Sequence, residues 1–307
     1  MSDEGVLDPW VVEWFAANPF VAQPFDDLSP EMLALARSPV GASPTREIAN
    51  VSDDVVAGIP VRIYEHDTAP TGVVVYFHGG AFCIGSIGLM DNVARELAHC
   101  SGATVVSVEY RLAPEDPYPA GLDDCESVTR WALENASRLG ASPDRVAVAG
   151  ESAGGNLSAA VTLRLRDTVD PPLAGQVLMY PGVDGFHTSH PSRDEFDGVV
   201  ISLKSSTFGD AYTAGRDLDH DPFVAPLQAE SLAGLPPAIV VLGGCDPLRD
   251  EGRLYARRLH DAGVDVEEIC CAGQPHGFIN FGFPAAAGAF SRMGTFLRSV
   301  FVADQAS

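Results

Sequence analysis

Basic residues are scarce in this chain of 307 residues. It carries 19 Lys and Arg against 42 Asp and Glu, which gives a formal net charge of −23. Lys204 is the only lysine, so chemistry through a lysine nucleophile or a Schiff base has a single, poorly placed candidate. Nucleic acids and anionic membranes repel a strongly acidic protein, and we therefore expect neither as a partner. Neutral or cationic small molecules are the favoured substrates.

Long apolar runs and paired cysteines are also lacking. No apolar stretch approaches the roughly 20 residues that span a membrane, and the acidic N-terminus does not resemble a secretory signal, so we expect a soluble, cytoplasmic protein. The six cysteines show neither the spacing of a zinc site nor the density of a disulfide framework, which predicts free thiols and no metal. With 46% hydrophobic residues, the chain can bury one large core.

Short β-branched runs alternate with amphipathic stretches from about residue 73 onward. This alternation predicts the α/β class, with a mostly parallel central sheet flanked by helices. The predicted strands are 73–77, 103–109, 145–149, 175–180, 238–243 and 264–270, and the predicted helices are 89–100, 120–138, 153–167, 249–262 and 285–301. Residues 46–51 and 60–65 alternate polar and apolar side chains, which indicates an antiparallel pair at the sheet edge.

Two segments do not follow the alternation. Residues 1–45 and the insertion 184–220 both carry scattered aromatic side chains. We expect them to form a helical cap over the carboxyl ends of the strands, where ligands bind in open α/β sheets. The core would then comprise residues 46–183 and 221–307. The alternative is that the aromatic residues only anchor two excursions to the core.

The segment 150–155, with the sequence Gly-Glu-Ser-Ala-Gly-Gly, lies between a predicted strand and a predicted helix. A strand, a sharp turn and a helix around G-x-S-x-G form a nucleophile elbow, in which glycines allow a strained turn that exposes the serine hydroxyl. Ser152 is therefore the candidate nucleophile. The string alone could also be an ordinary turn, so the assignment depends on its partners.

A serine nucleophile needs a base and an acid, which follow it along the chain in this type of fold. His276 lies on a loop after the last predicted strand and is favoured as the base over His260, which lies in a helical pattern. Asp246 ends the preceding strand and is favoured as the acid. Asp250 and Glu251 are alternatives, but their place at a helix start is explained by the helix dipole.

The oxyanion of a tetrahedral intermediate needs convergent amide donors. The string His78-Gly79-Gly80-Ala81-Phe82 follows the strand 73–77, where such donors belong. We expect the amides of Gly79, Gly80 and Ala153 to form the oxyanion hole.

With these motifs the chain resembles the hormone-sensitive-lipase branch of the α/β-hydrolases, which includes bacterial carboxylesterases of family IV. The resemblance runs over about two hundred residues. It includes the strings 78–82, 110–115, 150–155, 246–252 and 276–278. It implies a capped α/β-hydrolase fold and a serine esterase for short to medium acyl esters, with Ser152, Asp246 and His276 as the triad and no cofactor. The family often has a third glycine where Ala81 stands, and an aspartate where Glu151 stands.

Four aromatic residues near these motifs and in the predicted cap are candidates for substrate contact: Phe82, Phe208, Tyr212 and Phe278. The same triad could serve an amidase, a deacetylase or a lactonase, because only the pocket selects among them. A receptor without catalysis is a rival of another class, and the presence of His276 argues against it. The final helix and last strand are candidates for pairing two copies into a homodimer.

Overall fold

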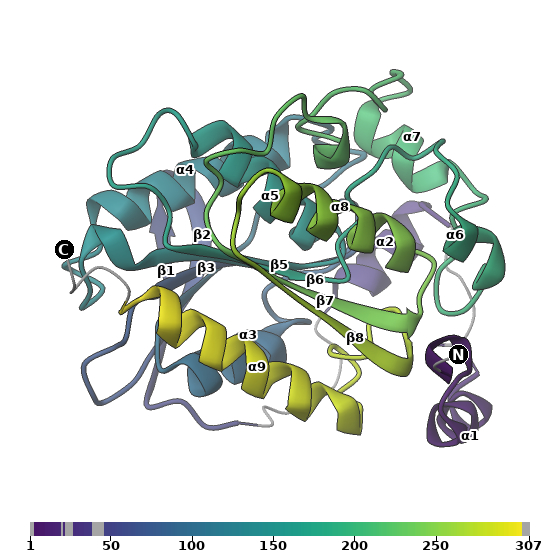
Figure 1. Cartoon of the computed structure of the whole chain (residues 1–307), viewed down its shortest axis with the longest axis horizontal. Coiled ribbons are helices and arrows are strands. Elements are labelled where there is room, and N and C mark those ends of the chain that lie inside the picture. The colour runs from purple at the N-terminus through teal and green to yellow at the C-terminus, as the bar shows by residue number, and fades with distance from the viewer. Residues whose placement is uncertain (1–2, 20, 22–26, 39–45, 303–307) are drawn as a thin grey trace.

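The central sheet of the computed structural model has eight strands in the order β1-β2-β4-β3-β5-β6-β7-β8 (Figure 1). The structure describes residues 3–19, 21, 27–38 and 46–302. The strands are β1 (Asn50–Val56), β2 (Ile59–Glu65), β3 (Val73–Phe77), β4 (Thr104–Val108), β5 (Val146–Glu151), β6 (Gly175–Met179), β7 (Ala238–Cys245) and β8 (Val266–Pro275). β2 runs antiparallel to both its neighbours, and the pairs from β4 to β8 are parallel. This confirms the α/β class with a mostly parallel central sheet that the sequence predicts.

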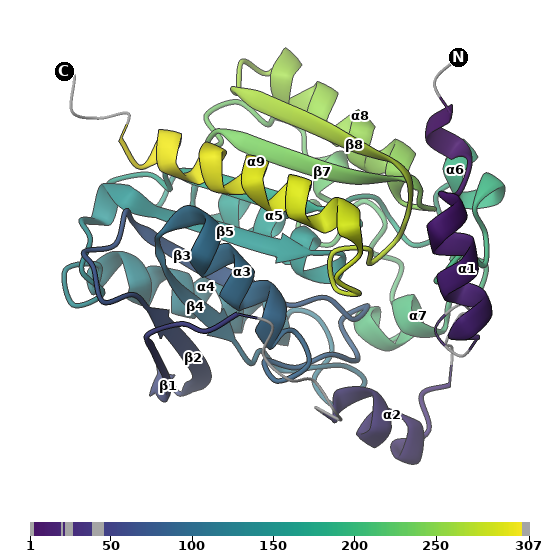
Figure 2. The same cartoon turned by 90° about the horizontal axis from the view of Figure 1, so that it is seen from below.

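Helices cover both faces of the sheet, which explains why the central strands read as unbroken apolar runs. Every residue of β3 to β7 is buried. One face is covered by α3 (Asp91–Ser101) and α9 (Pro284–Val300). The other is covered by α4 (Ala120–Glu134), α5 (Ala153–Leu165) and α8 (Arg249–Asp261), as Figures 1 and 2 show.

Short helices from the two predicted cap segments lie beyond the carboxyl ends of the strands (Figure 2). The N-terminal segment contributes η1 (Asp3–Gly5), α1 (Pro9–Ala17) and α2 (Pro30–Arg37), and the insertion contributes α6 (Pro191–Glu195) and α7 (Thr207–Thr213). Residues 1–2, 20, 22–26 and 39–45 of the predicted N-terminal cap lie outside the described residues. The remaining helical turns are η2 (Pro143–Arg145) and η3 (Pro226–Gln228).

Three elements differ by more than two residues from the boundaries predicted from the sequence. β1 covers 50–56, not 46–51, because its pairing with β2 runs from Asn50, opposite Glu65, to Val56, opposite Ile59. The helix predicted over 120–138 ends at Glu134, where the Asn135 side chain donates to the Trp131 carbonyl and closes the last turn. β8 continues five residues past 270, and there the Asp8 amide donates to the Gly273 carbonyl at 3.0 Å. A distant segment therefore supports the end of this strand, which local periodicity does not reveal.

Among the described residues, the helices are all too short or too polar to cross a bilayer. The same residues contain no group of three His, Cys, Asp or Glu side chains arranged to hold a metal ion. All six cysteines are free.

Candidate active site

Ser152 occupies a strained turn between β5 and α5. Its backbone has φ +56° and ψ −117°, a conformation that L residues adopt only where the surrounding structure enforces it. The turn is tight because a Cβ at Gly150 would lie 2.1 Å from the Gly154 carbonyl oxygen, and one at Gly154 would lie 2.0 Å from the Phe77 carbonyl oxygen. These two glycines let α5 begin directly against β3, so the serine hydroxyl projects from the end of the sheet.

Ser152, His276 and Asp246 form one hydrogen-bonded chain. The His276 Nε2 atom lies 2.9 Å from Ser152 Oγ, and Nδ1 lies 2.8 Å from Asp246 Oδ2. Asp246 is fully buried, and its second oxygen accepts the Leu248 amide at 2.8 Å. Because an ionised carboxylate only accepts, Nδ1 carries the imidazole proton and Nε2 is free to accept the proton of the serine.

The alternative acids and base have other partners. His260 is exposed over 77% of its side chain and faces Asp261. Asp250 is held by Arg249 and by the Ser192 amide. The described contacts of these residues do not include Ser152 or His276.

The candidate oxyanion donors differ by one residue from the prediction. The Gly79 amide donates to Glu151 Oε1 at 2.6 Å, so it is not free to bind an oxyanion. The amides of Gly80, Ala81 and Ala153 have no hydrogen-bond acceptor within the described part of the chain, and all three residues line the pocket beside Ser152. The candidate donors are therefore the amides of Gly80, Ala81 and Ala153, with Ala81 in place of the predicted Gly79.

The shift arises from the backbone of the loop that follows β3. Gly80, Ala81 and Phe82 have φ values of +123°, +49° and +64°. Consecutive left-handed residues turn successive amides toward one side and form an anion-binding concavity. The third residue of the motif is an alanine, and the sequence could have identified it only through the family pattern of a glycine at this place.

A pocket of about 460 Å³ opens over Ser152. Phe82 and Phe208 line it, as predicted from the sequence. Tyr212 stacks directly behind Phe82 with ring centroids 3.8 Å apart, so it supports the wall without lining it. Phe278 was expected at the substrate, but it is fully buried in the core against Tyr180, and Phe281 lines the pocket instead.

Both predicted cap segments reach this pocket. Val21 from the N-terminal segment and residues 200–203 and 205 from the insertion line it together with core residues. The polar part of the wall contains the buried pair Arg193 and Glu251, whose charges neutralise one another. Most of the remaining lining is apolar, which suits an uncharged organic group.

A family model described as "alpha/beta hydrolase fold" matches residues 74–280. The chain belongs to the α/β-hydrolase family. It is 36% identical to the esterase LipI of Mycobacterium tuberculosis, with 94% of each chain covered. It is 43% identical over 257 residues to the carboxylesterase NlhH of the same organism, with 80% of each covered. A solved structure of a hyperthermophilic esterase from Pyrobaculum calidifontis has a TM-score of 0.86 at 33% identity, covering 96% of this chain and 98% of that one.

These relatives confirm the resemblance to the hormone-sensitive-lipase branch that the motifs indicated. The matches to LipI and to the Pyrobaculum esterase span nearly the whole of this α/β-hydrolase, so the similarity is not confined to one part of the chain.

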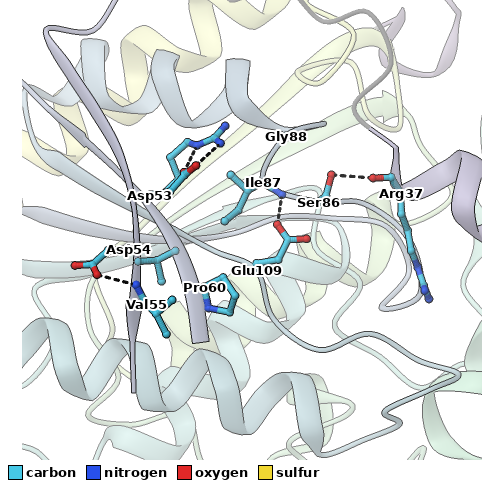
Figure 3. Close-up of a pocket in the computed structure, with 11 residues that line it drawn as sticks. Arg37, Asp53, Asp54, Val55, Pro60, Ser86, Ile87, Gly88 and Glu109 are labelled. Carbon is cyan, nitrogen blue, oxygen red and sulfur yellow. Dashed lines mark hydrogen bonds and ion pairs between the residues drawn. The ribbon is translucent and has the colours of Figure 1, made fainter. Parts of the chain in front are cut away.

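A second hollow of about 690 Å³ lies between the β1–β2 hairpin and residues 86–88 (Figure 3). The Glu109 carboxylate accepts the Ile87 amide at 2.8 Å there, and Asp53 pairs with Arg62. Among the described residues that line it, the one hydroxyl is that of Ser86, which donates to the Arg37 carbonyl. The lining residues that the structure describes include no histidine beside this serine, so we assign the chemistry to the pocket over Ser152.

Proposed function

We propose that this α/β-hydrolase is a serine carboxylesterase that cleaves short to medium acyl esters through an acyl-enzyme on Ser152. One observation carries the proposal: the carboxylate, imidazole and hydroxyl of Asp246, His276 and Ser152 are joined at 2.8 and 2.9 Å, beside amides that have no acceptor among the residues described. The names of the relatives, which are esterases and carboxylesterases, support the same activity.

The first half of the reaction forms the acyl-enzyme. Ser152 Oγ attacks the ester carbonyl carbon while His276 Nε2 takes the hydroxyl proton. The carbonyl oxygen becomes an oxyanion that accepts hydrogen bonds from the amides of Gly80, Ala81 and Ala153. As the intermediate collapses, His276 gives its proton to the alcohol oxygen, the ester C–O bond breaks and the alcohol leaves.

Water completes the cycle with the same groups. A water molecule attacks the acyl carbonyl carbon and gives a proton to His276. The bond to Ser152 Oγ then breaks, the proton returns to the serine, and a carboxylic acid is released. Asp246 holds the imidazole in the required tautomer and stabilises the imidazolium during both halves. These groups supply the nucleophile, the base and the oxyanion donors, so the proposal requires no metal or cofactor.

We infer that residues 1–45 and 184–220 act as the cap that shapes the pocket. Val21, Ile201 and Leu203 support this role, because they line the pocket from outside the core. Together with Phe82 and Phe208 they make walls that fit an apolar acyl or alcohol group. A Phe208→Ala variant should accept longer acyl chains than the wild type, and a chain-length series of p-nitrophenyl esters would measure it.

The test of the proposed function is labelling with an organophosphonate followed by peptide mapping. One equivalent on Ser152, with loss of turnover, is expected, and Ser152→Ala should neither react nor turn over. An adduct on another residue would overturn the assignment. Matching esters and anilides separate an esterase from an amidase, and the receptor alternative requires that no ester is turned over at all.

Location and assembly stay predictions. The expected cytoplasmic location is tested by fractionation of cells that produce the full-length protein. The homodimer expected from the final helix and last strand is tested by light scattering at several protein concentrations.

A further inference from the structure

The carboxylate of Glu151 is buried between the loops that carry the proposed site. Glu151 directly precedes Ser152 and is only 1% exposed. Its Oε1 atom accepts the Gly79 amide at 2.6 Å and the Tyr76 hydroxyl at 3.1 Å. A Cβ placed on Gly79 would lie 2.0 Å from the second carboxylate oxygen, so the loop after β3 rests directly on this side chain.

The same carboxylate contacts the loop that carries the base. Asn280, four residues after His276, donates a hydrogen bond to Glu151 from its side-chain amide. The Asn280 oxygen in turn accepts the Tyr180 hydroxyl at 2.7 Å, which fixes the orientation of the amide. One carboxylate therefore joins the oxyanion loop, the nucleophile turn and the base loop.

We propose that Glu151 is a positioning residue for ester hydrolysis, and that its ionised carboxylate holds these three loops in the arrangement the reaction requires. By holding the Gly79 amide, it sets the peptide planes that follow, so that the amides of Gly80 and Ala81 face the pocket. The inference rests on the proposed function, because it assumes the roles given there to these amides and to His276.

The charge state of Glu151 changes near neutral pH. Burial raises the pKa of Glu151 to about 7, although hydrogen bonds from Gly79, Asn280 and Tyr76 and the nearby His276 act in the opposite direction. The ionised form, which accepts the strongest hydrogen bonds, is therefore lost as the pH falls through about 7.

The titratable groups that face Glu151 come from four elements. They are Tyr76 on β3, Tyr110 after β4, Tyr180 after β6 and His276 after β8. Burial raises the pKa of each tyrosine well above its ordinary value, so all three stay neutral during an assay. His276, which Asp246 faces from the other side, must also be neutral to act as a base. The acid limb of the pH profile should accordingly report two protons.

The principal test compares pH profiles of Glu151→Gln and wild type with a p-nitrophenyl ester between pH 5 and 9. The variant should lose about tenfold or more in kcat with KM little changed. Removal of a whole oxyanion donor costs roughly 10²–10³-fold, and donors that are only displaced should cost part of that. On the acid side of its profile, the rate should depend on the loss of one proton, whereas the wild-type rate depends on two. Glu151→Asp, which keeps the charge, should restore the second proton.

Glu109→Gln is the matched control. Glu109 is also a carboxylate that accepts a backbone amide and whose pKa burial raises, but it lies in the second hollow (Figure 3). Its replacement should leave both limbs of the profile unchanged. A loss of the second proton in this variant would overturn the assignment to Glu151.

Tyr76→Phe tests the proposal with Glu151 in place. Removing this donor destabilises the ionised carboxylate, so the corresponding ionisation should move upward by about one pH unit. This variant decides the matter if Glu151→Gln does not fold.

Organophosphonate labelling separates the two proposals. If Glu151→Gln is labelled on Ser152 and keeps the wild-type kcat and pH profile, the role of Glu151 is wrong while the proposed esterase mechanism stands. If the wild type is labelled elsewhere, the proposed function itself fails.

Discussion

The buried carboxylate of Glu151 should lower stability at neutral pH. Its pKa is 4.5 when unperturbed and about 7 in the folded protein. A carboxyl group with a raised folded pKa contributes stability below the unfolded value, and this contribution is lost as the pH rises through the folded value. At 1.36 kcal/mol per unit, the ionised side chain costs about 3 kcal/mol of unfolding free energy above pH 8.

Glu151→Gln removes this pH dependence because an amide does not ionise. The unfolding free energy of the variant minus that of the wild type should therefore increase by about 3 kcal/mol between pH 4.5 and pH 8. For a chain of 307 residues this corresponds to about 5 °C in Tm. The constant difference below pH 4.5 reports how well the amide fits the site.

Urea unfolding at several pH values, followed by tryptophan fluorescence, measures this difference. Other buried groups titrate in both proteins and cancel. Burial, for example, lowers the pKa of His78 to about 4, so its contribution to the unfolding free energy is lost in both proteins as the pH falls below 6.5. Parallel curves for the two proteins at all pH values would refute the reasoning, because they would mean that Glu151 titrates alike in the folded and unfolded states.

Four further substitutions have defined outcomes. Asp246→Asn should fold but lose about 10⁴-fold in kcat through the wrong imidazole tautomer, and an unchanged rate in steady-state assays would point to another acid. Ala81→Gly should relieve the strain of φ +49° and raise the unfolding free energy by about 0.5–1 kcal/mol with activity retained, whereas a lower Tm would contradict this. Gly154→Ala should cost about 3 kcal/mol or more, because its Cβ would lie 2.0 Å from the Phe77 carbonyl oxygen. Gly288→Ala in α9, where the Cβ meets nothing within 4 Å, should instead stabilise by about 1 kcal/mol in the same thermal unfolding experiment.

The strands and the three residues of the candidate triad could be predicted because their signals are local or follow from chain order. β3 is buried on both faces and therefore appears as an unbroken apolar run. Ser152, Asp246 and His276 each follow a strand of one parallel sheet, and the carboxyl ends of such strands meet at one edge. Their positions directly after three strands of this sheet were therefore enough to predict that they lie together.

The orientation of single groups could not be predicted in this way. Gly79 belongs to the motif, but its amide is directed by a carboxylate 72 residues away, and spacing along the chain does not show which amides of a turn remain free. Phe278 lies two residues after His276, yet it points into the core while Phe281 faces the pocket. In an irregular loop no period assigns alternate residues to opposite faces.

The loop that carries His276 is held from two sides, which links the N-terminal segment to the candidate site. On the inner side, Asn280 is bound to the Glu151 carboxylate. On the outer side, Phe281 lines the pocket and packs against Trp14 of α1, with ring centroids 5.5 Å apart. Because adjacent residues of one loop receive these two supports, a displacement of α1 would move the pocket wall and the inner hydrogen bonds together. The N-terminal segment can therefore affect both substrate fit and the position of the base, although Trp14 does not line the pocket.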